Sequence, residues 1–330
     1  MTSTRNSPRV APDIRVGTSG WSYPSGKGTW NGIFYPAPRG RQRRGAPKFD
    51  ELSFYAEHFN TVEVNSSFYR IPTVDSAKKW AARTPRNFEF SLKLYQKFTH
   101  PDMFVKATGS DPSDLSQRDV DEFRTAIDPI ARAGKLGALL AQFPASFKND
   151  PDARGYLEWL LARFQEYPVA VELRHRSWSD EREEILALLK SFGAAWAQID
   201  EPKFKGSIRQ SRSGDPGAFY YLRLHGRNAA QWWKHDKSED RYNYLYSAEE
   251  LEPFAEAAKD VCRKVKKAYL YANNHFSAKS VANAAILQYQ LGQNVSGEYP
   301  EAFMEHFPDL KGIVKLLPEQ PGLIPSRKPS

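Results

Sequence analysis

The sequence has almost no cysteine, and this limits both its cross-links and its metal chemistry. Cys262 is the only one in 330 residues, which excludes an internal disulfide and a thiol cluster for a metal ion. A single cysteine also suits a reducing compartment, so we expect a cytoplasmic protein.

Long hydrophobic runs and nucleotide-binding motifs are missing as well. No apolar run approaches the roughly 20 residues that a membrane-spanning helix needs, so no membrane partner is expected. The polar residues 1–12 predict a disordered N-terminal tail rather than a secretory signal. Neither GxGxxG nor a GxxxxGKS-type loop occurs, and no HxH or HExxH pair predicts a zinc site.

What the sequence does contain is a surplus of positive charge. The 47 lysines and arginines against 39 aspartates and glutamates give a net charge of +8, which favours contact with anions. Part of the surplus lies in a loop punctuated by glycine and proline, at Arg39, Arg41, Arg43 and Arg44. This basic loop is either a solvated loop or a patch that contacts nucleic-acid phosphates.

Short strands alternate with longer amphipathic helices along the chain. Strands are expected at residues 14–20, 61–69, 88–95, 136–143, 168–175, 194–200, 219–225 and 267–275. Helices are expected at residues 48–59, 74–83, 117–133, 152–164, 181–192, 248–266 and 277–291, with a further one at 300–310. Only the connection 201–217 shows no helix. Eight such units predict an α/β fold, a single (β/α)8 TIM barrel over residues 13–312, followed by a proline-rich tail at 313–330.

One stretch carries the clearest sign of a functional site. Residues 219–228 read FYYLRLHGRN, so in a strand Arg223 and His225 lie on the face opposite Leu222 and Leu224. The fifth strand repeats this layout, because its aliphatic residues alternate with Glu172 and Arg174. The aliphatic side packs against helices, which turns the charged side toward the barrel axis.

The same alternation places polar side chains from most strands inside the barrel near its C-terminal rim, where TIM barrels assemble active sites. Glu63 in the second strand, and Trp196 and Gln198 in the sixth, are also expected to face inward. Charge buried without a partner costs several kcal/mol, so these groups either form a structural ion-pair network or meet a ligand. The inward set at the rim is Asn65, Lys93, Gln142, Glu172, Arg174, Asp200, Arg223, His225, Asn273 and His275.

The inward set favours a small anionic or phosphate-bearing ligand, because its cations outnumber its carboxylates. The candidate catalytic residues are Glu172, Asp200, His225, His275 and Lys93, the last as an acid/base group or an imine-forming amine. The candidate substrate-binding residues, several of them in aromatic loops at the rim, are Trp21, Tyr23, Asn65, Tyr69, Gln142, Arg174, Trp178, Arg223, Arg227, Arg241, Tyr244, Asn273 and Asn274. No motif assigns a metal ligand, although Glu172, Asp200, His225 and His275 could together hold one divalent ion.

Many of these stretches resemble motifs of the DUF72, or YecE-like, family. They include GTSGWSY from Gly17, TVEVNSSFYR from Thr61, VELRHRSW from Val171, LRLHGRN from Leu222 and YANNH from Tyr271. The resemblance runs in order from about residue 14 to 291 and implies a TIM barrel of unestablished biochemical function, for which a relation to the endonuclease-IV barrel has been suggested. The basic loop is longer than is usual there, and Asn243 stands where an acidic residue is common.

Three functions stay open at this point. The leading hypothesis is an enzyme, a hydrolase or acid/base catalyst, that acts on a phosphate-bearing substrate, with nucleic acid among the candidates. The second is a sugar or sugar-phosphate isomerase or a glycosidase that uses Glu172 and Asp200 as its carboxyl pair. The third is a barrel that binds nucleic acid or a small anion without catalysis. The sequence does not identify the substrate, a bound metal or the oligomeric state.

Overall fold

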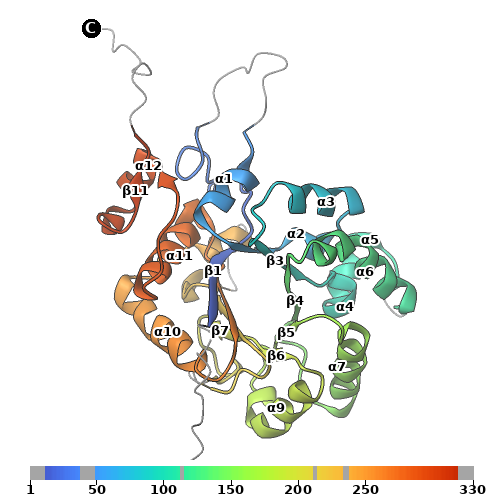
Figure 1. Cartoon of the computed structure of the whole chain (residues 1–330). Coiled ribbons are helices and arrows are strands. Elements are labelled where there is room, and N and C mark those ends of the chain that lie inside the picture. Colours follow the sequence, from blue (N-terminus) through green and yellow to red (C-terminus); the bar gives the residue numbers. More distant parts are fainter. Residues whose placement is uncertain (1–11, 38–48, 112–114, 211–213, 233–237, 319–330) are drawn as a thin grey trace, which may run out of the picture.

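The computed structural model of the chain describes residues 12–37, 49–111, 115–210, 214–232 and 238–318 (Figure 1). At its centre lies a nine-stranded parallel sheet in the order β6-β5-β4-β3-β2-β1-β9-β8-β7. The strands are β1 (Asp13–Ser19), β2 (Thr61–Val64), β3 (Glu89–Lys93), β4 (Leu136–Gln142), β5 (Val169–Glu172), β6 (Ala195–Trp196), β7 (Gln198–Asp200), β8 (Tyr220–Leu224) and β9 (Lys267–Ala272).

Strands β6 and β7 are two pieces of one strand, with only Ala197 between them. β6 pairs with β5 and β7 pairs with β8, so the sheet closes on itself. At the break, the Gln210 carboxamide donates to the carbonyl of Ala197 (2.8 Å) and accepts from the N–H of Ile199 (3.0 Å). The predicted (β/α)8 TIM barrel is therefore confirmed, with eight strand positions.

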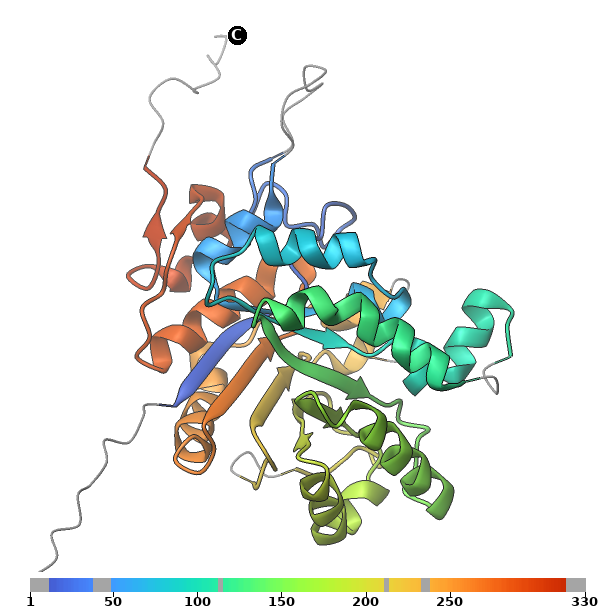
Figure 2. The ribbon, with the colours of Figure 1, turned by 45° about the vertical axis from the view of Figure 1, so that its right-hand side comes forward.

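Helices surround the barrel, as the two views in Figure 1 and Figure 2 show. Several begin at a side chain that accepts from an unpaired N–H of the first turn, as Asp50 does from Ser53 (3.1 Å) and Asp150 from Ala153 (2.9 Å). All seven expected crossover helices are present: α1 (Glu51–His58), α3 (Val74–Ala82), α6 (Gln117–Arg132), α7 (Pro151–Phe164), α9 (Arg182–Ser191), α10 (Ala248–Val261) and α11 (Lys279–Gln290).

Short helices that periodicity did not predict follow several strands on the C-terminal side of the barrel. The second strand was expected to run to Tyr69, but β2 ends at Val64 and the chain turns into a helix. As expected, the connection after β7 contains no helix in its described residues, 201–210 and 214–217. The additional helices are α2 (Ser66–Tyr69), α4 (Gln96–Thr99), α5 (Pro101–Thr108) and α8 (Ser177–Asp180).

The inside of the barrel is filled by large side chains on one side and small ones on the other. Tyr221, Tyr269 and Tyr271 of β8 and β9 are fully buried, and they share a cluster with alanines of β4, β5 and β6. Gly17 of β1 also makes room, because a Cβ at this position would overlap the Thr61 carbonyl oxygen. Aromatic rings thus occupy the volume that branched aliphatics fill in many TIM barrels.

This packing reverses the face expected for the sixth strand. Ala195 and Ala197 belong to the interior cluster, whereas Trp196 packs outward, with the Arg182 guanidinium of α9 5.7 Å from its ring centroid. In β7, Asp200 pairs with the outward-facing Leu224. The prediction that Trp196, Gln198 and Asp200 face inward is therefore wrong, because small residues are needed opposite the tyrosines.

Beyond the barrel, α12 (Glu301–His306) and a two-stranded sheet of β10 (Glu298–Tyr299) and β11 (Lys315–Leu316) complete the described chain. β11 lies past residue 312, so ordered structure continues into the segment expected to be a tail. The expected N-terminal tail lies, apart from Pro12, outside the described residues. Within the described chain, no helix has the length and apolar character needed to cross a bilayer.

Candidate functional site

Arg223 lies at the centre of the polar interior, at the C-terminal rim. Its guanidinium donates to both carboxylate oxygens of Glu63 (2.6 and 2.9 Å), to Glu172 (2.6 Å) and to the Gln142 side chain (3.1 Å). The arginine is 1% exposed and both glutamates 0%. Arg223 was predicted to hold substrate, but its guanidinium donates its hydrogen bonds to protein side chains and so positions the glutamates around it.

Glu172 is shared between two arginines. Its second oxygen accepts from Arg174 Nε (2.7 Å), and the side chain of Arg174 keeps 14% exposure toward the mouth. Burial alone would raise the pKa of Glu172, but the guanidinium groups of Arg223 and Arg174 outweigh it and hold the pKa well below its usual range. Glu172 is therefore an ionised anchor for Arg174.

His225 completes this layer of the interior. Asn273 Nδ2 donates to its Nδ1 (2.8 Å), and its Nε2 lies 3.3–3.4 Å from the guanidinium groups of Arg174 and Arg223 and 3.4 Å from Glu172. Burial lowers the pKa of His225 to about 3, although the Glu172 carboxylate opposes the shift. The imidazole is neutral at physiological pH, so it can accept or relay a proton.

Lys93 ends β3 on the interior face, as alternation predicted. Its Nζ lies 4.3 Å from the centroid of the Phe68 ring. Burial, reinforced by the nearby Arg223 guanidinium, lowers the pKa of Lys93 to about 7. A substantial fraction of the amine is therefore neutral at physiological pH.

Two residues at this mouth were not predicted. Glu201 directly follows β7, is 6% exposed, and has its Oε2 3.5 Å from Arg174 NH1. Burial raises the pKa of Glu201, and Arg174 offsets this only in part. Burial, with Lys93 nearby, lowers the pKa of His100 to about 3. Both lie beyond strand ends, where alternation gives no signal, although His100 belongs to the FTH stretch at residues 98–100.

Aromatic residues form one side of the rim. Tyr23 stacks on His275 with ring centroids 4.4 Å apart, and its hydroxyl contacts Asn65. Tyr242 covers the same imidazole at 5.0 Å, and burial lowers the pKa of His275 to about 4. Tyr69 is 65% exposed. Of these, Tyr23, Tyr69 and His275 were expected at the rim. Arg241, also expected there, has its guanidinium 5.9 Å from the Tyr242 ring centroid.

The backbone next to this rim is strained. Ser277 and Ala278 have φ values of 51° and 60°, a region that residues with a Cβ seldom adopt. Ser277 N–H donates to the carbonyl of Gly28, which ties the segment to the loop after β1 (3.1 Å). Strain of this kind often accompanies functional sites, and here it directly follows His275.

Other expected site residues lie outside the barrel interior. Asp200 accepts from Arg227 (2.7 and 3.1 Å) and from the Tyr246 hydroxyl (2.8 Å), and Arg227 also pairs with Glu250 of α10 (3.0 Å). This cluster fixes the loop after β8 to α10. The expectation that Asp200 and Arg227 reach the mouth is therefore wrong, because β7 turns Asp200 to its outer face and the pairing draws Arg227 of the following loop to the same side.

Tyr244, Asn274, Trp178 and Trp21 have structural contacts as well. The Tyr244 hydroxyl donates to Glu250, and Asn274 donates to the Tyr244 carbonyl and to Asn283 of α11. Trp178 is 0% exposed and donates to the Phe147 carbonyl. Trp21 meets Trp80 of α3 edge-on. Each of these side chains packs elements together, away from the charged network.

The four residues considered as a metal site are not assembled as ligands. Both Glu172 oxygens accept from guanidinium groups, and Asp200 is on the outer face. Within the described chain, no group of three or more His, Cys, Asp or Glu residues has a suitable arrangement. Asp200 is likewise unavailable to form a carboxyl pair with Glu172 in a glycosidase.

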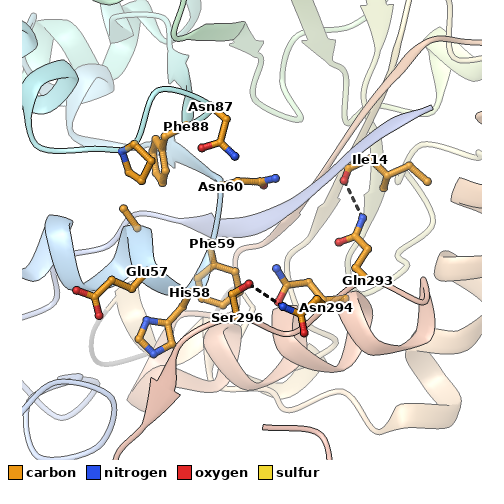
Figure 3. Close-up of a pocket in the computed structure, with 13 residues that line it drawn as sticks. Ile14, Glu57, His58, Phe59, Asn60, Asn87, Phe88, Gln293, Asn294 and Ser296 are labelled. Carbon is orange, nitrogen blue, oxygen red and sulfur yellow. Dashed lines mark hydrogen bonds between the residues drawn. The ribbon is translucent and has the colours of Figure 1, made fainter. Parts of the chain in front are cut away.

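A hollow of about 440 Å³ lies at the opposite, N-terminal end of the barrel (Figure 3). Side-chain amides of Asn60, Asn87 and Asn294 line it, while Gln293 donates to the Ile14 carbonyl (2.8 Å). None of the predicted site residues lies there. Glu57 and His58 do line the hollow, but the predicted catalytic residues that the structure brings together lie at the C-terminal mouth.

The comparisons with known proteins agree with this architecture. The profile described as "Protein of unknown function DUF72" matches residues 15–304. The chain belongs to the DUF72 family. A relative in Bacillus subtilis (strain 168), the UPF0759 protein YunF, is 29% identical over 294 residues, which cover 87% of this chain and 98% of YunF. The UPF0759 protein YecE of Escherichia coli K12 is 28% identical over 173 residues, 52% of each chain.

Solved DUF72 structures have the same fold. A DUF72 family protein from Thermotoga maritima MSB8 is 31% identical and superposes with a TM-score of 0.69, covering 85% of this chain and all of that one. A DUF72 family protein from Enterococcus faecalis V583 is 23% identical, with a TM-score of 0.70 over 87% of this chain and all of that one. The family name carries no reaction, so function has to be argued from the site.

Proposed function

We propose that this DUF72 protein is an enzyme that transfers protons on a small anionic substrate at the C-terminal mouth of the barrel. One observation carries the proposal. Arg174 contacts two carboxyl groups, Glu172 and Glu201, whose pKa values are displaced in opposite directions. Environments that shift the pKa values of two neighbouring acids in opposite directions are typical of acid/base catalysis.

The two carboxyl groups would have different roles. Glu172 stays ionised and fixes Arg174, whereas Glu201, whose pKa is raised by burial, is the candidate acid. Glu201 Oε2 has no hydrogen-bond partner in the described structure, and its contact with Arg174 is long, at 3.5 Å. A carboxylate or phosphate on the substrate can therefore take a share of the Arg174 donors.

We propose a small substrate for this mouth. The nucleic-acid hypothesis drew on the basic loop at Arg39, Arg41, Arg43 and Arg44, which lies outside the described residues, and on Arg227 and Arg241 beside the rim aromatics. Of these two, Arg227 is paired with Asp200 and Glu250. Phosphate-bearing sugars and carboxylic acids remain the candidate substrate classes. Lys93 and the neutral imidazoles of His100 and His225 supply further positions for a proton.

The test is deuterium incorporation. Purified protein would be incubated in D₂O with a panel of phosphorylated sugars and 2-oxo acids, and loss of acidic C–H signals followed by proton NMR, with released phosphate measured in parallel. We expect Glu201→Gln to slow the responsive reaction about 100-fold, the usual size of one acid/base group. Glu305→Gln, an exposed position on α12, is the matched control.

If phosphate were released without C–H exchange, the reaction would be a hydrolysis and not the proposed proton transfer. If Glu201→Gln and Arg174→Met both left the responsive reaction unchanged, the assignment of the site would be wrong.

A further inference from the structure

Three lysines with little exposed surface differ in the groups that accept hydrogen bonds from their ammonium groups. Lys97 is 8% exposed and donates to Asp119 (2.9 Å), and Lys135 is 6% exposed and donates to three oxygens of Ala81 and Thr84 (2.6–3.0 Å). Lys93 Nζ has neither a hydrogen bond nor an ion pair with any residue that the structure describes. Within the described part of the chain, its amine therefore has no acceptor.

The backbone that carries this amine is held by hydrogen bonds on both sides. The Lys93 carbonyl accepts from Ser67 Oγ (2.8 Å), and the next residue, Leu94, donates its N–H to the Leu140 carbonyl (3.0 Å). The side chain extends over Phe68, which is 3% exposed and meets His100 edge-on at 4.9 Å. A lysine held in place beside an apolar ring, without a carboxylate, is arranged as a nucleophile rather than as a structural cation.

We infer that Lys93 forms an imine with a small carbonyl compound that also bears a carboxylate or phosphate group. The inference rests on the proposed function, since it uses the same mouth and the same anion-binding Arg174. Both Lys93 and Arg174 lie close to Glu172, which pairs with Arg174 and influences the charge of Lys93. One substrate can thus place its anionic group on the arginine and its carbonyl carbon at the amine.

The step needs no oxidant or reductant. The neutral Lys93 nitrogen attacks the carbonyl carbon, its proton moves to the oxygen, and a carbinolamine forms. A second proton, from the Glu201 carboxyl, lets this oxygen leave as water, and the nitrogen becomes a protonated imine. The imine then withdraws electrons from the adjacent carbon, which promotes the proton transfer proposed above.

Reductive trapping tests the inference on the full chain. The protein would be incubated at pH 7.5 with pyruvate, with dihydroxyacetone phosphate, or with acetone as the uncharged probe, then reduced with borohydride, digested and analysed by mass spectrometry. We expect the adduct on Lys93 to exceed that on Lys97 or Lys135 at least tenfold, and to form more readily with an anionic probe than with acetone. Stronger labelling by pyruvate would indicate a 2-oxo acid substrate, and stronger labelling by dihydroxyacetone phosphate would indicate a phosphorylated ketone.

Variants sharpen the result. Lys93→Arg keeps the charge and is expected to abolish the adduct, whereas Lys97→Arg is expected to keep it. Arg174→Met is expected to reduce labelling by the anionic probes to the level seen with acetone. Absence of a Lys93 adduct with every probe, or labelling no stronger than at surface lysines, would overturn the inference.

The proposed function is tested separately. If Glu201→Gln lost deuterium exchange but no Lys93 adduct formed with any probe, the proposed proton transfer would stand and only the imine would be ruled out.

Discussion

At the scale of single residues, Arg223 shows how much charge this interior stabilises. Its guanidinium binds Glu63 and Glu172, and the Tyr221 hydroxyl and Ser19 Oγ also donate to Glu63 (2.7 and 2.8 Å). We expect Arg223→Met to lower the free energy of unfolding by about 3–5 kcal/mol, because it leaves buried carboxylates without their cation. Urea denaturation measures this.

A control for this substitution is available on α6. Arg132→Met removes an exposed i,i+4 pair with Asp128, and such pairs contribute little to stability. An equal loss in Arg132→Met and Arg223→Met would mean that the interior pairing is not what stabilises the barrel.

The same residues show what the sequence could and could not predict. Alternation placed Glu63, Glu172, Arg223 and His225 inside correctly, because aliphatic residues mark the opposite face of each strand. It could not show that Arg223 would pair with Glu63, which is 160 positions away in the chain. Nor could it reveal Glu201, which lies in a loop and owes its environment to Arg174 from the preceding strand unit.

At the scale of elements, complementary size decides which strand face turns inward. The sixth strand reads AAWAQID from residue 194, and its phase is ambiguous because both faces contain apolar residues. The tyrosines of β8 and β9 resolve it, since the alanines of this strand leave space for them and Trp196 would not. Sequence periodicity cannot weigh the volume of side chains that come from distant strands, and this is why the strand and Asp200 were assigned to the wrong face.

This size constraint gives a prediction for Gly17. We expect Gly17→Ala to destabilise the protein by at least about 2 kcal/mol, because its Cβ would overlap the Thr61 carbonyl oxygen across the β1–β2 ladder. Gly155→Ala in α7 is the matched control. A Cβ added at Gly155 would meet no atom within 4 Å, so this substitution should stabilise the helix by about 0.5–1 kcal/mol. Thermal unfolding compares them, and a neutral Gly17→Ala would contradict the close approach of these strands.

At the scale of the whole molecule, the buried imidazoles make stability depend on pH. Burial lowers the pKa values of His100, His225 and His275 to about 3, 3 and 4, against about 6.5 in an unfolded chain. Between pH 6.5 and 4 the unfolded state therefore binds more protons, and stability falls as pH falls. These three imidazoles together should contribute about 4 kcal/mol per pH unit near pH 5, about three protons. His58, whose pKa is also lowered by burial, adds to the slope in the same direction.

Urea denaturation across pH 4.5–7.5 measures this slope. His275→Gln should reduce it by about one proton. An unchanged slope in that variant would show that His275 is already protonated in the folded protein.

The interrupted strand has a consequence for how the barrel opens. Between β6 and β7, a single carboxamide from Gln210 occupies hydrogen-bonding groups that a continuous ladder would satisfy with backbone partners. A side chain can rotate away without disturbing the rest of the sheet, so the amide of Ile199 should exchange with deuterated solvent sooner than that of Leu270 in the middle of β9. The barrel is thus closed at this point by one side chain, and Gln210→Ala should make the break between β6 and β7 open more often than any other part of the sheet.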